Sequence, residues 1–85
     1  MRGIVFLGER QLELRKFPDP IPGFSEVVVE MRASGLCGSD LRPYRESRKE
    51  RGDPAQLKAG GHEPCGQVTE VGPGIRHVIV GDRVI

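Results

Sequence analysis

The chain has 85 residues, which is enough for one small domain and too few for a large buried core. Thirteen basic and twelve acidic residues leave a formal net charge of +1, so the overall charge predicts neither a nucleic-acid nor a membrane partner. Twelve glycines and seven prolines favour short strands joined by turns, and the expected fold class is mainly β.

Two cysteines are too few for a disulfide framework, and no apolar stretch approaches the roughly 20 residues of a membrane-spanning helix. The N-terminus enters an alternating pattern directly, without the apolar core of a signal peptide. These features predict a cytoplasmic location with reduced thiols.

The N-terminal half has a pattern typical of strands. Alternation of apolar and polar residues predicts strands over 4–7 and 12–17, joined by a turn at 8–11 as an opening hairpin. Three prolines within 18–23 predict an extended connector, because proline removes a backbone donor and restricts the residue before it. A strand with one buried face is expected over 26–33.

The middle of the chain is more polar. Ser39 and Asp40 can cap a short helical turn, which we expect over 41–45. The charged run over 42–53 interleaves arginine and glutamate, and we expect a solvated loop or a weak helix there.

Two further strands are expected near the C-terminus, over 66–71 and over 78–85, the second with a turn at 81–82. The strand-like residues that end the sequence are typical of an interrupted chain, so we expect a longer natural protein.

Candidate metal ligands occur in two glycine-rich segments. Cys37 lies within 35–40, while His62 and Glu63 follow two glycines and precede Pro64. A thiolate, an imidazole and a carboxylate are the ligand types of Zn²⁺, and the glycines allow the backbone to approach an ion closely. We predict that the two segments meet at a metal, where Glu63 binds the ion directly, binds it through water or orients another ligand.

Each candidate also has a simpler interpretation. A single cysteine such as Cys37 is usually a small buried apolar residue, and a single histidine such as His62 is usually a surface residue or a hydrogen-bonded core residue. The polar neighbours of both favour chemistry, and two ligands with one carboxylate would form the open site typical of catalytic zinc. Cys65 could coordinate or pair with Cys37, but the strand-like residues after it favour a buried apolar position.

These segments together resemble the zinc-dependent medium-chain alcohol, polyol and threonine dehydrogenase family. The segment 37–41 resembles the first zinc-ligand motif of that family. The residues 61–63, with Gly66, 71–72 and 81–84, resemble its zinc-alcohol-dehydrogenase signature. The resemblance implies that residues 1–85 are the N-terminal portion of a catalytic domain. The implied fold is a partial GroES-like β-barrel with one short helix and without the Rossmann domain.

The same resemblance implies roles for five side chains. Cys37 and His62 would be ligands of a catalytic zinc, and Glu63 would be an alternating or outer ligand. Asp40 would contact the ligands without binding the zinc and would orient them, and Ser39 would relay the proton of the substrate hydroxyl.

The implied reaction is hydride transfer from an alcohol, polyol or amino alcohol to NAD or NADP, which residues outside this chain would mainly bind. Arg42 stands where many relatives have a relay histidine, and arginine cannot act as a base near neutral pH. The expected partners are a small alcohol substrate and, for the full-length protein, further copies of itself. The 85 residues alone are expected to be inactive.

Two alternatives remain. The chain could be a truncated zinc-binding or interaction module without catalytic activity. A small co-chaperonin-like barrel is the other, and it rests on fold analogy alone.

Overall fold

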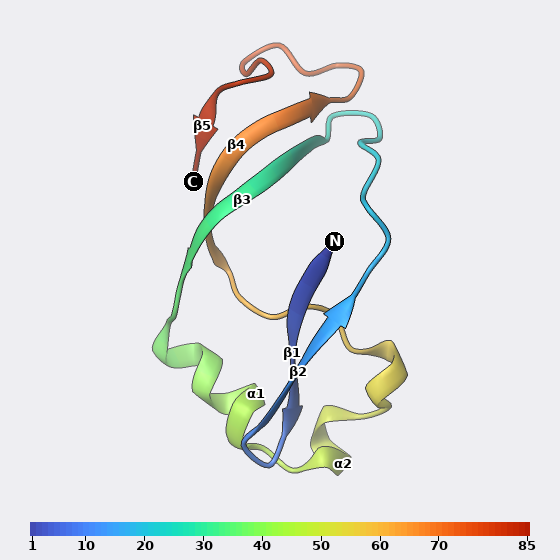
Figure 1. The fold of residues 1–85 in the computed structure, drawn as a ribbon, viewed down its shortest axis with the longest axis vertical. Helices are drawn as coiled ribbons and strands as arrows, with labels where there is room; N and C mark the ends of the chain where they lie inside the picture. The colour runs from blue at the N-terminus through green and yellow to red at the C-terminus, as the bar shows by residue number, and fades with distance from the viewer. The chain divides into compact units, whose positions relative to one another are not determined.

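The computed structural model describes all 85 residues and divides them into two compact units (Figure 1). The first unit contains Met1–Pro18 and Leu36–His62, and the second contains Asp19–Gly35 and Glu63–Ile85. The chain passes from one unit to the other three times, the first time between Pro18 and Asp19, inside the extended connector predicted over 18–23, which contains no helix or strand. The two units were not expected, because no linker that separates two cores was identified in the sequence.

The first unit is built on a hairpin of β1 (Arg2–Gly8) and β2 (Gln11–Lys16), drawn in blue in Figure 1. The two strands pair antiparallel, with Ile4 opposite Leu14. Val5 on β1 is completely buried and forms the centre of this unit. The hairpin predicted from the alternating pattern is confirmed.

The hairpin turn has an unusual sequence. Glu9 and Arg10 have φ values of 51° and 60°, which a tight two-residue turn requires but which glycine or asparagine normally supplies. Their backbone N–H groups donate to the carbonyls of Glu46 and Tyr44 at 2.8 and 2.7 Å. These two hydrogen bonds stabilise the turn and attach it to residues 44–46.

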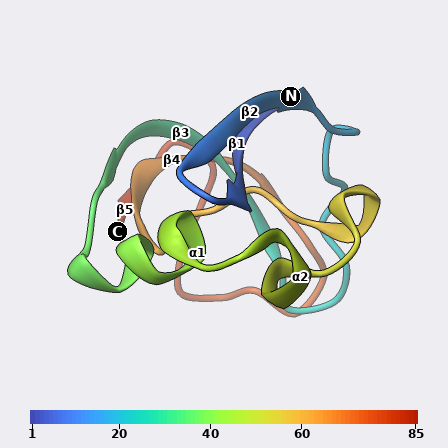
Figure 2. The same cartoon turned by 90° about the horizontal axis from the view of Figure 1, so that it is seen from below.

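Short helical segments make up much of the rest of this unit: η1 (Gly38–Asp40), α1 (Leu41–Arg45), α2 (Arg48–Arg51) and η2 (Pro54–Gln56). The segment α1 has the bounds expected for the short helix, and the charged run after it forms the weak helix α2. Both α1 and α2 pack against β1 (Figure 2). None of the helices is long and apolar enough to cross a membrane.

The second unit is an antiparallel sheet of β3 (Val27–Gly35), β4 (Glu63–Val71) and β5 (Arg83–Val84), in the order β3-β4-β5. The strands predicted over 26–33 and 66–71 are confirmed, and both are longer than expected. Val68 on β4 is 1% exposed and is the centre of this unit. The fold is therefore mainly β, as predicted.

Of the strand predicted over 78–85, only Arg83–Val84 is a strand. The turn predicted at 81–82 is present, since the Asp82 N–H donates to the Ile79 carbonyl at 3.1 Å and Gly81 has a φ of 98°. A side chain explains the difference, because the Asp82 carboxylate accepts a hydrogen bond from the Ile79 N–H at 3.0 Å and closes a turn. The Asp82 carbonyl also accepts from the N–H of Val68 at 2.8 Å. The Gly81 N–H donates to the Val68 carbonyl at 2.8 Å, so the turn stays bonded to β4 without forming a regular strand.

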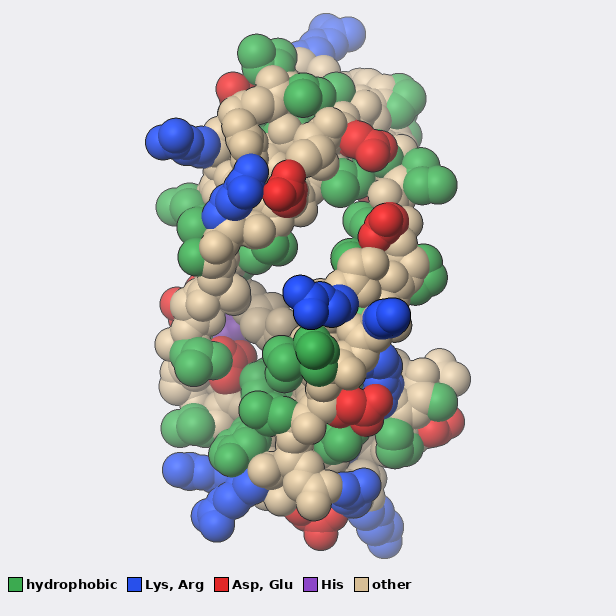
Figure 3. Space-filling view, viewed as in Figure 1, with side chains coloured by type: hydrophobic (Ala, Val, Ile, Leu, Met, Phe, Trp, Pro, Cys, Tyr) green, Lys and Arg blue, Asp and Glu red, His purple; other side chains and the backbone are tan.

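Few apolar side chains are fully enclosed. Only Val5 and Val68 have less than 2% exposure among the large side chains, and Figure 3 shows many apolar side chains at the surface. The face of β3 that was expected to be buried is partly open, since Met31 is 50% exposed. Each buried valine therefore carries a large share of the packing in its unit.

We predict that Val68→Ala lowers the free energy of unfolding by about 2 kcal/mol, because it removes buried methyl groups from a small core. Val71→Ala removes the same atoms from a side chain that is 40% exposed, and it should cost less than half as much. Urea unfolding followed by circular dichroism measures both variants. Equal losses would show that Val68 does not form the core of the sheet.

Candidate metal centre

Cys37 lies in extended conformation immediately before η1, with φ −101° and ψ 153°. The N–H of Asp40 donates to the Cys37 carbonyl at 3.0 Å and closes this first helical turn. The Cys37 side chain is partly exposed and forms no disulfide. The sulfur is therefore held on a defined backbone and remains accessible to a ligand.

Asp40 is the one buried charged residue of the chain, with 8% exposure. Its Oδ2 accepts a hydrogen bond from the Cys37 N–H at 2.9 Å. Its Oδ1 lies 3.4 Å from Nδ1 of His62. One carboxylate thus contacts both segments in which metal ligands were predicted.

His62 presents its two ring nitrogens to different partners. With Nδ1 protonated toward Asp40, Nε2 carries the lone pair that a metal ion binds. The hydroxyl Oγ of Ser39 lies 3.4 Å from Nε2. The imidazole is therefore oriented from one side and has a hydroxyl beside its other nitrogen.

Two glycines bring His62 to this position. Gly61 has a φ of 97°, a left-handed value that disfavours residues with a side chain. A Cβ atom on Gly60 would overlap the ring of Phe6, and the Gly60 N–H donates to the carbonyl of Ile4 at 2.8 Å. The glycine pair thus lets the backbone lie against β1, which is a packing role that the sequence did not reveal.

The candidate ligand atoms of Cys37 and His62 lie within 4.8 Å of one another. Two ligands of one zinc ion, bound at about 2.0–2.3 Å, are separated by about 3.5 Å in tetrahedral geometry. Small side-chain rotations would therefore bring both atoms onto one ion. The donor types and their spacing fit zinc.

The remaining predicted site residues fall as follows. Ser39 and Asp40 lie beside His62 in the first unit. Glu63 follows His62 directly in the chain, where it is the exposed first residue of β4 in the second unit. The polar corner expected around His62 is a bend at that residue, after which β4 begins.

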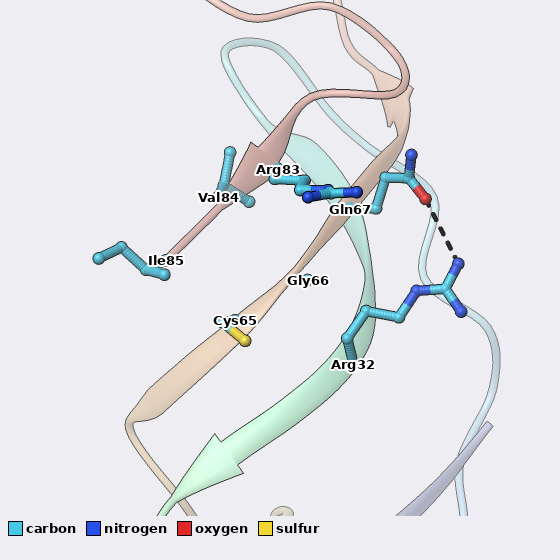
Figure 4. Close-up of a pocket in the computed structure, with 7 residues that line it drawn as sticks. All are labelled: Arg32, Cys65, Gly66, Gln67, Arg83, Val84 and Ile85. Atoms are coloured by element: carbon cyan, nitrogen blue, oxygen red, sulfur yellow. Dashed lines mark hydrogen bonds between the residues drawn. The ribbon is translucent and has the colours of Figure 1, made fainter.

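Cys65 and Arg42 take no part in this arrangement. Cys65 lies on β4 (Figure 4), opposite Ala33, and is a free thiol. It was expected to be buried, but it is only partly buried. The side chain of Arg42 is 89% exposed, and its Nε lies 3.8 Å from Oε2 of Glu46. Phe6 supports the Gly60 backbone and was missed, because a strand phenylalanine carries no signal of this role.

Comparison with known proteins decides the family. The family model for the alcohol dehydrogenase GroES-like domain matches residues 23–85. The chain belongs to this family. The resemblance seen in the ligand segments is confirmed.

Individual alcohol dehydrogenase relatives agree with the family match. The chain is 41% identical over 83 residues to the uncharacterized zinc-type alcohol dehydrogenase-like protein YphC of Escherichia coli, covering 92% of this chain and 24% of that protein. It is 40% identical over 83 residues to sorbitol dehydrogenase of Bos taurus, covering 95% and 23%. The chain therefore spans about a quarter of the length of these relatives.

The fold comparison gives the same result. An oxidoreductase/dehydrogenase of unknown specificity involved in membrane biogenesis from Escherichia coli superposes with a TM-score of 0.82 at 28% identity. The match covers 96% of this chain and 24% of that one. The GroES-like fold expected from the sequence is confirmed, and no Rossmann-type parallel sheet is present in residues 1–85.

We predict that Gly60→Ala lowers the free energy of unfolding by about 1–3 kcal/mol, because the added methyl group overlaps the Phe6 ring. Gly38→Ala is the matched control, since a Cβ there meets no atom within 4 Å. Thermal unfolding measures both. If Gly60→Ala melts at the same temperature as Gly38→Ala, the close contact with β1 does not hold the His62 segment.

Proposed function

We propose that Cys37 and His62 bind a catalytic zinc ion in an oxidoreductase, with Glu63 as a third or alternating ligand. The reaction proposed is hydride transfer from an alcohol, polyol or amino alcohol to NAD or NADP. The observation that supports the site most is the contact of the Asp40 carboxylate with both ligand segments. A side chain that only capped η1 would not need to meet a histidine from a distant segment.

Membership of the alcohol dehydrogenase family supports the proposed reaction class. Relatives whose names include zinc-type alcohol dehydrogenase and sorbitol dehydrogenase align along most of the chain. Because these relatives are about four times as long, the chain would supply one part of the active site. The nicotinamide cofactor would be bound mainly by residues outside it.

The residues of the chain have separable tasks in this proposal. A bound zinc ion would supply Lewis acidity toward the alcohol oxygen. The Asp40 carboxylate lies 3.4 Å from Nδ1 of His62, where it would accept a hydrogen bond from Nδ1–H and leave the lone pair of Nε2 available to the ion. The Cys37 thiolate adds negative charge to the ligand set and favours a soft ion.

Ser39 is positioned to transfer the hydroxyl proton of a bound alcohol to water. Its hydroxyl lies beside His62 Nε2 and is exposed to solvent. It can accept the hydroxyl proton of a bound alcohol at Oγ while it donates its own proton to water. Arg42 lies 3.8 Å from Glu46, and because an arginine side chain does not act as a base near neutral pH, it does not extend this relay.

Zinc titration of the chain by calorimetry tests the metal site without activity. We expect one zinc per chain, with at least a tenfold weaker affinity in Cys37→Ser and in His62→Ala. Cys65→Ser is the matched control, because it removes the other cysteine thiol of the chain, and it should bind zinc like the wild type. Equal weakening in Cys65→Ser would contradict the proposed ligand set.

The reaction is tested in the full-length gene product with a panel of alcohols, polyols and amino alcohols. Formation of NADH or NADPH is followed by absorbance, and Cys37→Ala should abolish it. An unchanged rate in Cys37→Ala would contradict the catalytic role. Zinc binding without any cofactor reduction would instead favour a binding module, so the two outcomes are distinguishable.

A further inference from the structure

Two charged side chains of the run over 42–53 are largely buried, although that run was expected to be solvated. Arg51, the last residue of α2, is 21% exposed, and Glu46, the residue that follows α1, is 15% exposed. By contrast, the neighbouring Arg42 is exposed and Arg48 is half-exposed. A charge that leaves water needs partners inside the protein, and the proposed chemistry uses neither Arg51 nor Glu46.

Arg51 joins three elements of the first unit through one guanidinium group. Its Nε donates a hydrogen bond to the carbonyl of Phe6 on β1 at 3.0 Å, and its Nη1 lies 3.4 Å from Oε1 of Glu46. The stem of the side chain packs on Gly8, where an added Cβ would come within 2.9 Å of the Arg51 Cγ. Because a guanidinium group is planar and rigid, it fixes the direction of one acceptor relative to the other. Arg51 on α2 therefore holds β1 and the end of α1 at a set spacing.

The contact with Glu46 leads to the Cys37 segment. Glu46 ends α1, since its N–H donates to the carbonyl of Arg42 at 2.8 Å. The five residues of α1 begin directly after Asp40, whose carboxylate accepts from the Cys37 N–H. A helix of this length spans about 7.5 Å, so its two ends move together. A displacement of Glu46 is therefore transmitted to Asp40 and Cys37.

The contact with Phe6 leads to the His62 segment. The Phe6 ring lies where a side chain on Gly60 would be, and Gly60 precedes His62 by two residues. Arg51 binds the Phe6 carbonyl next to the point where the register of β1 and β2 shifts. The guanidinium group thus holds β1 at the residue whose ring supports the backbone before His62.

We propose that Arg51 is a positioning residue of the metal centre, an inference that rests on the zinc site proposed above. Backbone hydrogen bonds attach each ligand segment to the hairpin separately, whereas Arg51 contacts both attachments with one side chain. It sets the spacing of Cys37 and His62, whose ligand atoms must come within about 3.5 Å of each other on one ion. Arg51 acts through Glu46 and Phe6 and does not touch the ion.

Replacing Arg51 should therefore change the geometry of a bound ion and not only the stability of the fold. Cobalt(II) is the probe, because it takes the same nitrogen and sulfur ligands as zinc and its visible absorption bands report its coordination geometry. In Arg51→Gln we expect these bands to shift or to lose intensity, and we expect cobalt to bind about three- to tenfold more weakly. Circular dichroism at the titration temperature gives the folded fraction, which corrects each affinity for a loss of folding.

Arg48→Gln is the matched control, since it removes the same charge from the same helix. Arg48 also contacts the hairpin, where its Nε lies 3.1 Å from Oε2 of Glu9. It makes no hydrogen bond or ion pair with Phe6 or Glu46. Its cobalt spectrum should equal that of the wild type, and its affinity should change by less than about twofold. Arg51→Lys keeps the charge but not the planar group, and its affinity should lie between those of the wild type and Arg51→Gln.

The outcomes separate this inference from the site on which it rests. If the wild-type chain binds neither cobalt nor zinc, the proposed metal site is wrong and this inference fails with it. If the wild type binds cobalt and folded Arg51→Gln has the same spectrum and affinity, or if Arg48→Gln changes both equally, the positioning role is overturned while the metal site stands. Should Arg51→Gln not fold, Glu46→Gln decides, because it keeps the shape of the acceptor and removes its charge. An altered cobalt spectrum in Glu46→Gln would support the positioning role, and an unchanged one would overturn it.

Discussion

The candidate metal centre depends on the carboxylate of Asp40. A buried charge is costly unless its oxygens are engaged, and both oxygens of this carboxylate face a nitrogen, the Cys37 N–H on one side and His62 Nδ1 on the other. The same group therefore holds the backbone of one candidate ligand and sets the ring orientation of the other. Without Asp40, the Cys37 N–H would lose its acceptor and His62 would lose the contact that selects its tautomer.

The first strand explains why two distant segments can meet at this carboxylate. The hairpin turn after β1 binds the end of α1 through the carbonyls of Tyr44 and Glu46, and α1 follows directly after Asp40. On the other side, Gly60 donates to the carbonyl of Ile4 and packs on the Phe6 ring. Both ligand segments are thus attached to one hairpin by backbone hydrogen bonds, which do not depend on side-chain identity. The positions of the ligands follow from this attachment.

Alternation of apolar residues was sufficient to predict the hairpin and the two long strands, because burial on one face imposes a period of two. Ligand chemistry pointed to Cys37, His62 and Glu63 as candidate ligands. The family motif added roles for Ser39 and Asp40. The positive φ angles of Glu9 and Arg10 could not be predicted, because hydrogen bonds to the carbonyls of residues 44 and 46 stabilise that turn. The short β5 follows from a side-chain contact of Asp82, and the packing of Gly60 follows from a tertiary contact. The turn at Glu9 and Arg10 and the packing of Gly60 depend on residues distant in sequence, and the contact of Asp82 with Ile79 is a side-chain contact that the alternation of apolar residues does not reveal.

The zinc affinity of Asp40→Asn tests the central claim most directly. Asparagine keeps the shape of the side chain but loses the charge that orients His62, so we expect zinc to bind about 10–100-fold more weakly in a chelator competition titration. Asp53→Asn makes the same chemical change at the cap of η2, where Oδ1 accepts from the Ala55 N–H, and it should leave the zinc affinity unchanged. Zinc binding to Asp40→Asn that equals that of Asp53→Asn and the wild type would contradict the account.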